Sequence, residues 1–184
     1  MSVWWLWGLA GCGVPDTLPD WEDSVPIEGD IPSCAPPRDV RVACVVDGDT
    51  LDVGQCGEDD GERIRLLGVN APELAHDDAP AECWADLATA QLERLVLGID
   101  ITLTFDAECE DIYGRTLAYL WIPAPEDEEE DLLVNEELLL EGHVRLYDEE
   151  WVDDLRHQTR LEDAEAEARA KGLGLWAACD DEDS

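Results

Sequence analysis

Oxygen-bearing side chains gather at two points of the chain and have the chemistry of a cation site. Asp47 and Asp49 flank a glycine and stand two positions apart, so at a strand end they face the same side. Asn70 and Glu73 close a second stretch, and we expect their loop to bring both side chains and the carbonyl of Ala71 to the same spot. Carboxylate, amide and backbone oxygens are hard ligands suited to Ca²⁺. The pattern therefore predicts a calcium site.

Two arginines, Arg65 and Arg115, complement these oxygens because a guanidinium can clamp a phosphate through two parallel hydrogen bonds. A metal ion, a carboxylate base and two arginines suit phosphodiester hydrolysis, since the cations stabilise transition-state charge and the base activates water. Each piece also has an ordinary interpretation. Asp-Gly-Asp is a common turn, a strand arginine is often an ion-pair partner, and Tyr113-Gly114 is typical of a hairpin. Their joint occurrence in this order favours the chemical interpretation.

The segments that must position these residues are predicted from period and turn composition. Alternating apolar residues indicate five β segments, at residues 40–46, 51–53, 63–69, 101–106 and 116–122. A helical period indicates three helices, at residues 80–97, 133–141 and 150–171. Gly98, Gly142 and Gly172 suit the helix ends. Five strands with a helix inserted between the third and fourth fit an α+β fold built on a small closed barrel of the OB type.

Three runs carry a resemblance to a known family. They are Val46-Asp47-Gly48-Asp49-Thr50, Ile64-Arg65-Leu66-Leu67-Gly68-Val69-Asn70-Ala71-Pro72-Glu73 and Asp111-Ile112-Tyr113-Gly114-Arg115-Thr116-Leu117-Ala118-Tyr119. In this order they resemble the staphylococcal-nuclease-like (thermonuclease) family, an OB-fold family of calcium-dependent phosphodiesterases acting on DNA and RNA. The resemblance extends over residues 39–176, and matches in the closing helices support it.

The resemblance implies a role for each matching residue. Asp49 would bind calcium with Asn70 and the carbonyl of Ala71, and Asp47 would lie close to the ion. Glu73 would be the general base or the group that orients the attacking water. The groups that would contact phosphate oxygens are Arg65, Arg115 and Tyr113.

Three positions depart from the family pattern. Asn70 stands where the family usually has Asp, so one negative charge is missing and we expect weaker calcium binding. Ile112 replaces a lysine that often precedes the tyrosine. Of the tyrosines that usually stack on the base, only Tyr147 is available.

Composition bounds the remaining possibilities. At 184 residues with 45% hydrophobic content, the chain suffices for one domain with a real core. Its 47 acidic and 11 basic residues give a formal charge of -36, which repels polyanions at long range. This charge is the strongest argument against a nucleic-acid ligand, because nucleic-acid readers are usually basic. We interpret the acids as a solvated surface around a locally positive site.

The N-terminus predicts export. Residues 1–11 are apolar, and Leu9-Ala10-Gly11-Cys12 resembles the lipobox of bacterial lipoproteins, in which the cysteine carries the lipid. Residues 12–38 are rich in proline and acids and are expected to be a tether, followed by the domain at 39–177 and an acidic tail at 178–184. We therefore expect a membrane-anchored lipoprotein on the periplasmic or extracellular face, or a secreted form, acting as a monomer.

Cysteine counting agrees with an oxidising compartment. Seven cysteines leave six once Cys12 is set aside, which is compatible with three disulfides. Connectivity does not follow from the sequence. The expected pairs are Cys44 with Cys56, Cys83 with Cys109, and Cys34 with Cys179. His76, His143 and His157 are isolated and are interpreted as loop or helix-surface residues.

The favoured hypothesis is an exported, lipid-anchored, calcium-dependent nuclease. The retained Arg65, Glu73 and Arg115 favour it, because a binding scaffold does not need all three. An OB-fold binding module with weakened catalysis is the alternative, favoured by Asn70 and by the acidic surface. A purely structural disulfide-stapled domain is a third hypothesis.

Overall fold

The structure, a computed structural model, describes residues 31–57, 61–76, 79–125, 130–147 and 155–179. The expected signal segment at residues 1–11, the lipidation site Cys12 and the last five residues of the acidic tail lie outside these ranges. Within the described ranges, no helix is long and apolar enough to cross a membrane.

Eight strands and four helices make up the described chain. The strands are β1 (Arg38–Val45), β2 (Thr50–Val53), β3 (Glu62–Leu66), β4 (Val69–Asn70), β5 (Asp100–Thr104), β6 (Thr116–Ile122), β7 (Leu132–Leu133) and β8 (Arg145–Leu146). The helices are α1 (Ala85–Val96), α2 (Val134–Leu140), α3 (Gln158–Lys171) and α4 (Leu175–Ala178).

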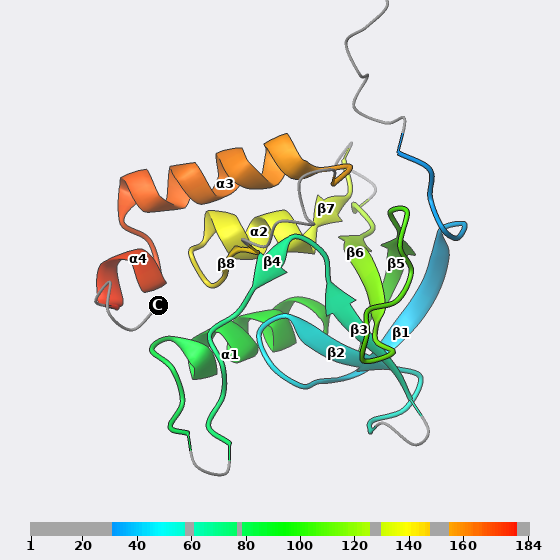
Figure 1. Ribbon diagram of the computed structural model, residues 1–184, viewed down its shortest axis with the longest axis horizontal. Helices are drawn as coiled ribbons and strands as arrows, with labels where there is room; N and C mark the ends of the chain where they lie inside the picture. The colour runs from blue at the N-terminus through cyan, green and yellow to red at the C-terminus, as the bar shows by residue number, and fades with distance from the viewer. Residues whose placement is uncertain (1–30, 58–60, 77–78, 126–129, 148–154, 180–184) are drawn as a thin grey trace, which may run out of the picture.

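Five of these strands close into a barrel, which confirms the predicted fold. Four antiparallel pairings order them β3-β2-β1-β5-β6, and a parallel pairing of β3 with β6 joins the two edges. The helices α1 and α2 contact the barrel through β1 and β6, and α3 lies on α2 (Figure 1). The core inside consists of fully buried aliphatic side chains, among them Leu51, Ile64, Leu92, Leu120 and Leu138.

The third predicted strand is divided in two by Gly68. β3 ends at Leu66 and β4 begins at Val69, because Gly68 has a left-handed φ of 73° that turns the chain. A Cβ at Gly68 would lie 2.6 Å from Cδ1 of Leu161 in α3, so a side chain there would also collide with the core. The break lets β4 leave the barrel and pair with β8.

The first and third helices begin later than the periodicity predicts. Helix α1 starts at Ala85 instead of Pro80, because Trp84 has φ 78°, a left-handed conformation that a right-handed helix cannot contain. Helix α3 starts at Gln158, while residues 150–154 of the predicted helix lie outside the described ranges. Its end at Gly172 is as predicted, with φ 60° at that residue.

The disulfides confirm one predicted pair and contradict two. Cys44 is bonded to Cys56, but Cys34 is bonded to Cys109 and Cys83 to Cys179. The predicted pairs Cys83–Cys109 and Cys34–Cys179 were wrong, because the prediction assumed that the two ends of the domain meet. Instead, the segment before β1 lies against the chain after β5, where the Cys34 nitrogen donates to Asp106 O at 2.7 Å. The C-terminal end lies beside the start of α1 (Figure 1).

Two of the three histidines are less exposed than expected. His76 is exposed, but His143 and His157 are half-buried. His143 accepts a hydrogen bond from Nε1 of Trp84 at 3.2 Å, and His157 makes edge-on ring contacts with Tyr119 and Trp121. These contacts use the histidines as packing groups.

Candidate active site

The turn between β1 and β2 presents the first two predicted ligands. The nitrogens of Val46 and Asp47 donate to the carbonyl of Thr50 at 2.9 and 3.2 Å, which closes the turn. Inside it, Asp47 Oδ1 accepts the nitrogen of Asp49 at 3.0 Å. Gly48 lies so close to α1 that a Cβ there would be 2.7 Å from the Cβ atoms of both Ala71 and Ala88. The glycine therefore allows the turn to rest on the helix.

Asp49 is a buried carboxylate with a nearly complete set of donors. Its Oδ1 accepts the hydroxyl of Thr50 at 2.9 Å, and its Oδ2 accepts the nitrogen of Ala71 at 2.7 Å and lies 3.1 Å from Nη2 of Arg65. Burial raises the pKa of Asp49 to about 6, and the nearby Asp47 carboxylate adds to this rise, while Arg65 opposes it. A carboxylate has about four lone-pair sites, so one on Oδ1 remains for a cation.

Arg65 is the centre of the cluster and is itself buried. Its Nη1 donates to the carbonyls of Leu66 and Val69 at 2.8 and 2.7 Å, which holds the chain across the Gly68 break. Its Nη2 donates to Asn70 Oδ1 at 3.0 Å and faces Asp49. These four contacts account for both terminal nitrogens, and among the described residues the Nε–H is left as the donor for a further ligand.

The β4 segment brings the second group of predicted ligands to the first. Asn70 is exposed and joins the cluster through Arg65, and the nitrogen of Ala71 joins it through Asp49. Four of the predicted site residues are thus linked by direct contacts: Asp49, Arg65, Asn70 and Ala71. Asp47 is attached through the backbone of Asp49.

Glu73 follows on an exposed loop whose base is closed by Glu82. The nitrogen of Glu73 donates to Glu82 Oε2 at 2.9 Å, and its carbonyl accepts the nitrogen of Glu82 at 2.9 Å. Its own carboxylate is on an exposed residue, where water has access. The role of Glu73 in activating or orienting a water molecule stays a prediction.

Arg115 lies on a separate turn held by Asp111. Asp111 Oδ1 accepts the backbone nitrogens of Tyr113 and Arg115 at 2.9 Å each, and Oδ2 accepts Nε of Arg115 at 2.6 Å. Burial alone would raise the pKa of Asp111, but these donors outweigh it and hold the pKa below its usual value. Within the described part of the chain, Arg115 has no partner at its terminal nitrogens, so both are available for a phosphate.

The strand register relates this turn to the cluster. Arg65 in β3 pairs with Leu117 in β6, so Arg115 lies two residues before the position opposite Arg65. Tyr113 is 78% exposed beside Arg115, whose guanidinium carbon lies 5.5 Å from the centre of its ring. Tyr147 stands on the other side, with the Arg65 guanidinium carbon 5.5 Å from its ring centre.

Sequence reasoning missed three residues that hold the site. Thr50 donates to Asp49, Asp111 orients Arg115, and Glu82 closes the Glu73 loop. The contact of Asp111 could have been predicted from the sequence, because an acidic residue four positions before an arginine on a hairpin turn can face that arginine. The Glu82 contact has no local signal, since it joins residues across a nine-residue gap.

The residues fit a hard cation by the chemistry of their donors. Every candidate ligand atom is an oxygen: carboxylates from Asp47 and Asp49, an amide from Asn70 and a carbonyl from Ala71. Among the described residues, no group of three or more His, Cys, Asp or Glu side chains could hold a metal ion.

Comparisons with known proteins identify the family of this chain. A family model described as staphylococcal nuclease homologue matches residues 63–178. The thermonuclease of Staphylococcus intermedius is 32% identical over 155 residues, covering 82% of this chain and 86% of that protein. The thermonuclease of Staphylococcus hyicus is 28% identical over 137 residues, covering 74% and 75%. An SPbeta prophage-derived endonuclease of Bacillus subtilis is 28% identical over 140 residues, covering 76% and 44%. The predicted family is confirmed, and this chain belongs to the staphylococcal nuclease homologue family.

Proposed function

We propose that this protein hydrolyses phosphodiester bonds of DNA or RNA with the help of Ca²⁺. The observation that carries the proposal is the linked cluster of Asp49, Arg65 and Asn70 beside a second arginine, Arg115, whose terminal nitrogens are available. The nuclease names of the relatives support the reaction class.

The two arginines divide the binding of phosphate unequally. Arg115 offers a planar fork for two phosphate oxygens, and Asp111 fixes its direction through Nε. Arg65 uses its two terminal nitrogens for four contacts within the protein, so it offers the phosphate its charge and its Nε–H. Arg115 is therefore the main phosphate clamp, and Arg65 stabilises transition-state charge from a fixed position.

Glu73 completes the chemistry as the exposed carboxylate that takes a proton from water or orients it. Asp49, Asn70 and the carbonyl of Ala71 would hold the calcium ion, with Asp47 nearby. When bound, the ion supplies charge stabilisation at the phosphate and favours ionised Asp49, whose pKa burial raises. Tyr113, which is 78% exposed, and Tyr147 would contact the substrate.

Cleavage of single-stranded DNA by the purified, oxidised protein tests the proposal. The assay is run at moderate salt, which screens the charge of -36, with Ca²⁺ and then with a chelator. Calcium-dependent cleavage that vanishes with chelator supports the nuclease. Arg115→Ala and Glu73→Ser should each abolish it in a folded protein.

Asn70 favours a second candidate, a binding module of the same fold. Its amide oxygen already accepts Nη2 of Arg65 at 3.0 Å and carries no charge for a cation. DNA binding without cleavage at any calcium concentration, by protein with intact disulfides, would support the module and refute the nuclease.

Export and lipid anchoring at Cys12 belong to the same proposal. The six other cysteines of the chain are all disulfide-bonded, which suits an oxidising compartment and leaves Cys12 for the lipid. We expect the protein to act as a monomer at the membrane surface. Lipid labelling of the wild type that is lost in Cys12→Ser tests the anchor, and light scattering of the purified protein tests the monomer.

A further inference from the structure

The three disulfides lie next to the three segments that carry the candidate chemistry. One cysteine of each pair lies within three positions of such a segment: Cys44 is three positions before the turn at residues 47–50, Cys109 is two positions before the turn at 111–115, and Cys83 directly follows Glu82. The other cysteine of each pair lies in a connecting or terminal segment: Cys56, Cys34 and Cys179.

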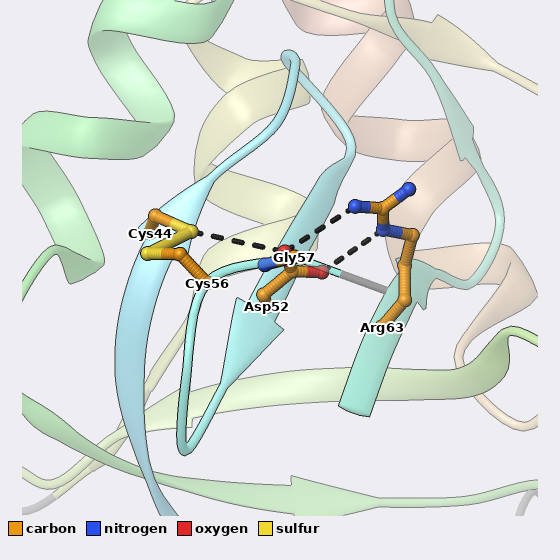
Figure 2. The surroundings of a disulfide bond; sticks show 5 residues. All are labelled: Cys44, Asp52, Cys56, Gly57 and Arg63. Atoms are coloured by element: carbon orange, nitrogen blue, oxygen red, sulfur yellow. Dashed lines mark hydrogen bonds and ion pairs between the residues drawn. A yellow bond between two sulfur atoms is a disulfide. The ribbon is translucent and has the colours of Figure 1, made fainter. Parts of the chain in front are cut away.

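The first disulfide secures the hairpin below the Asp47–Asp49 turn. Cys44 in β1 is opposite Asp52 in β2, and its sulfur lies 3.7 Å from Asp52 Oδ2. Figure 2 shows that the carboxylate of Asp52 gathers three elements beside the disulfide. It accepts the nitrogen of Gly57 at 2.8 Å and Nε of Arg63 at 2.9 Å. The bond to Cys56 thus ties β1 to the loop after β2, and the Asp52–Arg63 ion pair beside it joins β2 to β3.

The second disulfide secures the base of the turn that carries Arg115. The carbonyl of Cys109 accepts the nitrogen of Leu117 at 2.9 Å, and the nitrogen of Asp111 donates to the carbonyl of Arg115 at 3.0 Å. Leu117 is the residue that pairs with Arg65 across β3 and β6. Cys34 is in turn held by its backbone bond to Asp106 O, so the turn is anchored to the wall of the barrel.

The third disulfide secures the return of the Glu73 loop. Glu82, whose backbone and side chain hold Glu73, is followed directly by Cys83. Cys179 fixes this point to the end of α4. Because Glu73 and Glu82 are both exposed, their hydrogen bonds compete with water, and a covalent bond next to them limits the opening of the loop.

We infer that the three disulfides are positioning devices for the reaction, each assigned to one segment of the site. Cys44–Cys56 positions the Asp47–Asp49 turn, Cys34–Cys109 positions Arg115, and Cys83–Cys179 positions Glu73 through Glu82. The inference rests on the proposed function for its kinetic consequences. Its geometric part, selective anchoring of three segments, is independent of the reaction.

Each disulfide should therefore give a different kinetic defect when it is removed. Without Cys44–Cys56, the calcium concentration at half-maximal rate rises while kcat at saturating calcium is retained. Without Cys34–Cys109, kcat falls and KM for DNA rises at unchanged calcium dependence. Without Cys83–Cys179, kcat falls and KM is retained. A displacement of about 1 Å can lower a rate by about a hundredfold, so kcat should fall about ten- to a hundredfold in the two variants that lack Cys34–Cys109 or Cys83–Cys179.

The experiment compares three paired Cys→Ser variants, each lacking one disulfide, with the control Leu103→Ala. Leu103 is fully buried in β5, and its truncation lowers stability without removing a disulfide or a site residue. Amide hydrogen exchange by mass spectrometry and steady-state kinetics are measured well below the melting temperature of every variant. Exchange should rise selectively in the segment assigned to the missing disulfide, and the control should show no such selectivity.

A substitution that keeps all disulfides provides a second test. Glu82→Ala removes the acceptor for the Glu73 nitrogen and should lower kcat at unchanged KM, as the loss of Cys83–Cys179 does. Glu82→Gln keeps an acceptor oxygen and should restore most of the rate. The matched control is Glu93→Ala, at an exposed position of α1.

The outcomes separate this inference from the proposed function. Selective exchange together with the three kinetic signatures supports both. Selective hydrogen exchange in the variants, combined with a wild type that does not cleave DNA, would refute the proposed nuclease function and still support the anchoring of the three segments by the disulfides. Exchange that rises uniformly, or rates that fall only in proportion to stability as in Leu103→Ala, overturns the inference.

Discussion

Replacing Arg65 by alanine should both lower the free energy of unfolding and inactivate the protein. Replacing Arg115 by alanine should inactivate the protein and leave its stability nearly unchanged. Arg65 is 8% exposed, and its two terminal nitrogens make four contacts with two carbonyls, Asn70 and Asp49. Alanine would leave these acceptors without their donor. The Asp49 carboxylate would remain buried without its cation.

The size of the effect follows from this burial. Breaking a buried ion pair by removing one partner typically costs about 3–5 kcal/mol of unfolding free energy. For a domain of this size, that corresponds to a melting temperature lower by about 6–20 °C. Arg115 forms an ion pair with Asp111 and is partly exposed, so its loss should cost about 1 kcal/mol or less. Each variant should lose about a hundred- to a thousandfold in kcat.

Thermal and urea unfolding followed by tryptophan fluorescence measures the difference, since the chain has eight tryptophans. The measurements are made without calcium and with the disulfides intact, so that binding does not contribute to stability. Equal melting temperatures for Arg65→Ala and Arg115→Ala would refute the assignment of Arg65 as the structural centre. Retained activity in Arg115→Ala would refute its role as the phosphate clamp.

Three further variants test individual features of the site. Gly48→Ala should lose about 1–3 kcal/mol of stability by overpacking, because the new Cβ would lie 2.7 Å from that of Ala71, and calorimetry measures the loss. Asn70→Asp adds a charge next to the cation ligands and should tighten calcium binding about tenfold, or about 1–2 kcal/mol, in a calcium titration. Asp52→Asn should lose about 2 kcal/mol at neutral pH, because Arg63 holds the pKa of Asp52 below its usual value. That carboxylate stabilises the fold above the unfolded pKa of about 4, and its contribution disappears as the pH falls through the lower folded pKa.

The controls are specific to each variant. A wild-type melting temperature for Gly48→Ala would contradict the close packing of the turn on α1. Gln55→Glu adds the same single charge at an exposed position and should leave calcium affinity unchanged; an equal gain there would contradict the role of Asn70. A stability difference between wild type and Asp52→Asn that does not shrink as the pH is lowered further and further below 4 would contradict the assigned pKa shift.

Local patterns were sufficient for the barrel and for most of the candidate site. Alternating side chains in runs such as residues 100–104 decide which face is buried, and a register shift by one residue would turn the buried side chains toward solvent. The motifs around Asp49, Arg65 and Arg115 were therefore placed on the correct strands and turns. The chemical roles of all the candidate site residues remain predictions: Asp47, Asp49, Arg65, Asn70, Ala71, Glu73, Tyr113, Arg115 and Tyr147.

Local patterns failed where the backbone departs from regular geometry for a distant reason. The period of the first helix continues back to Pro80, but Trp84 adopts φ 78°, Cys83 is bonded to Cys179, and the Trp84 indole donates to His143. Nothing in the neighbouring residues specifies these partners. The helix is shortened by contacts that exist only in the folded domain.

By itself the sequence determined the residue types of the site, their order and the strands that carry them, because period and turn chemistry depend on near neighbours. Only the tertiary structure decided the cysteine pairing and the different environments of Arg65 and Arg115. Barrel closure through β3 and β6 buries one arginine among four acceptors and leaves the other held by a single side chain. Such choices depend on which distant segments meet, and that is a property of the closed fold.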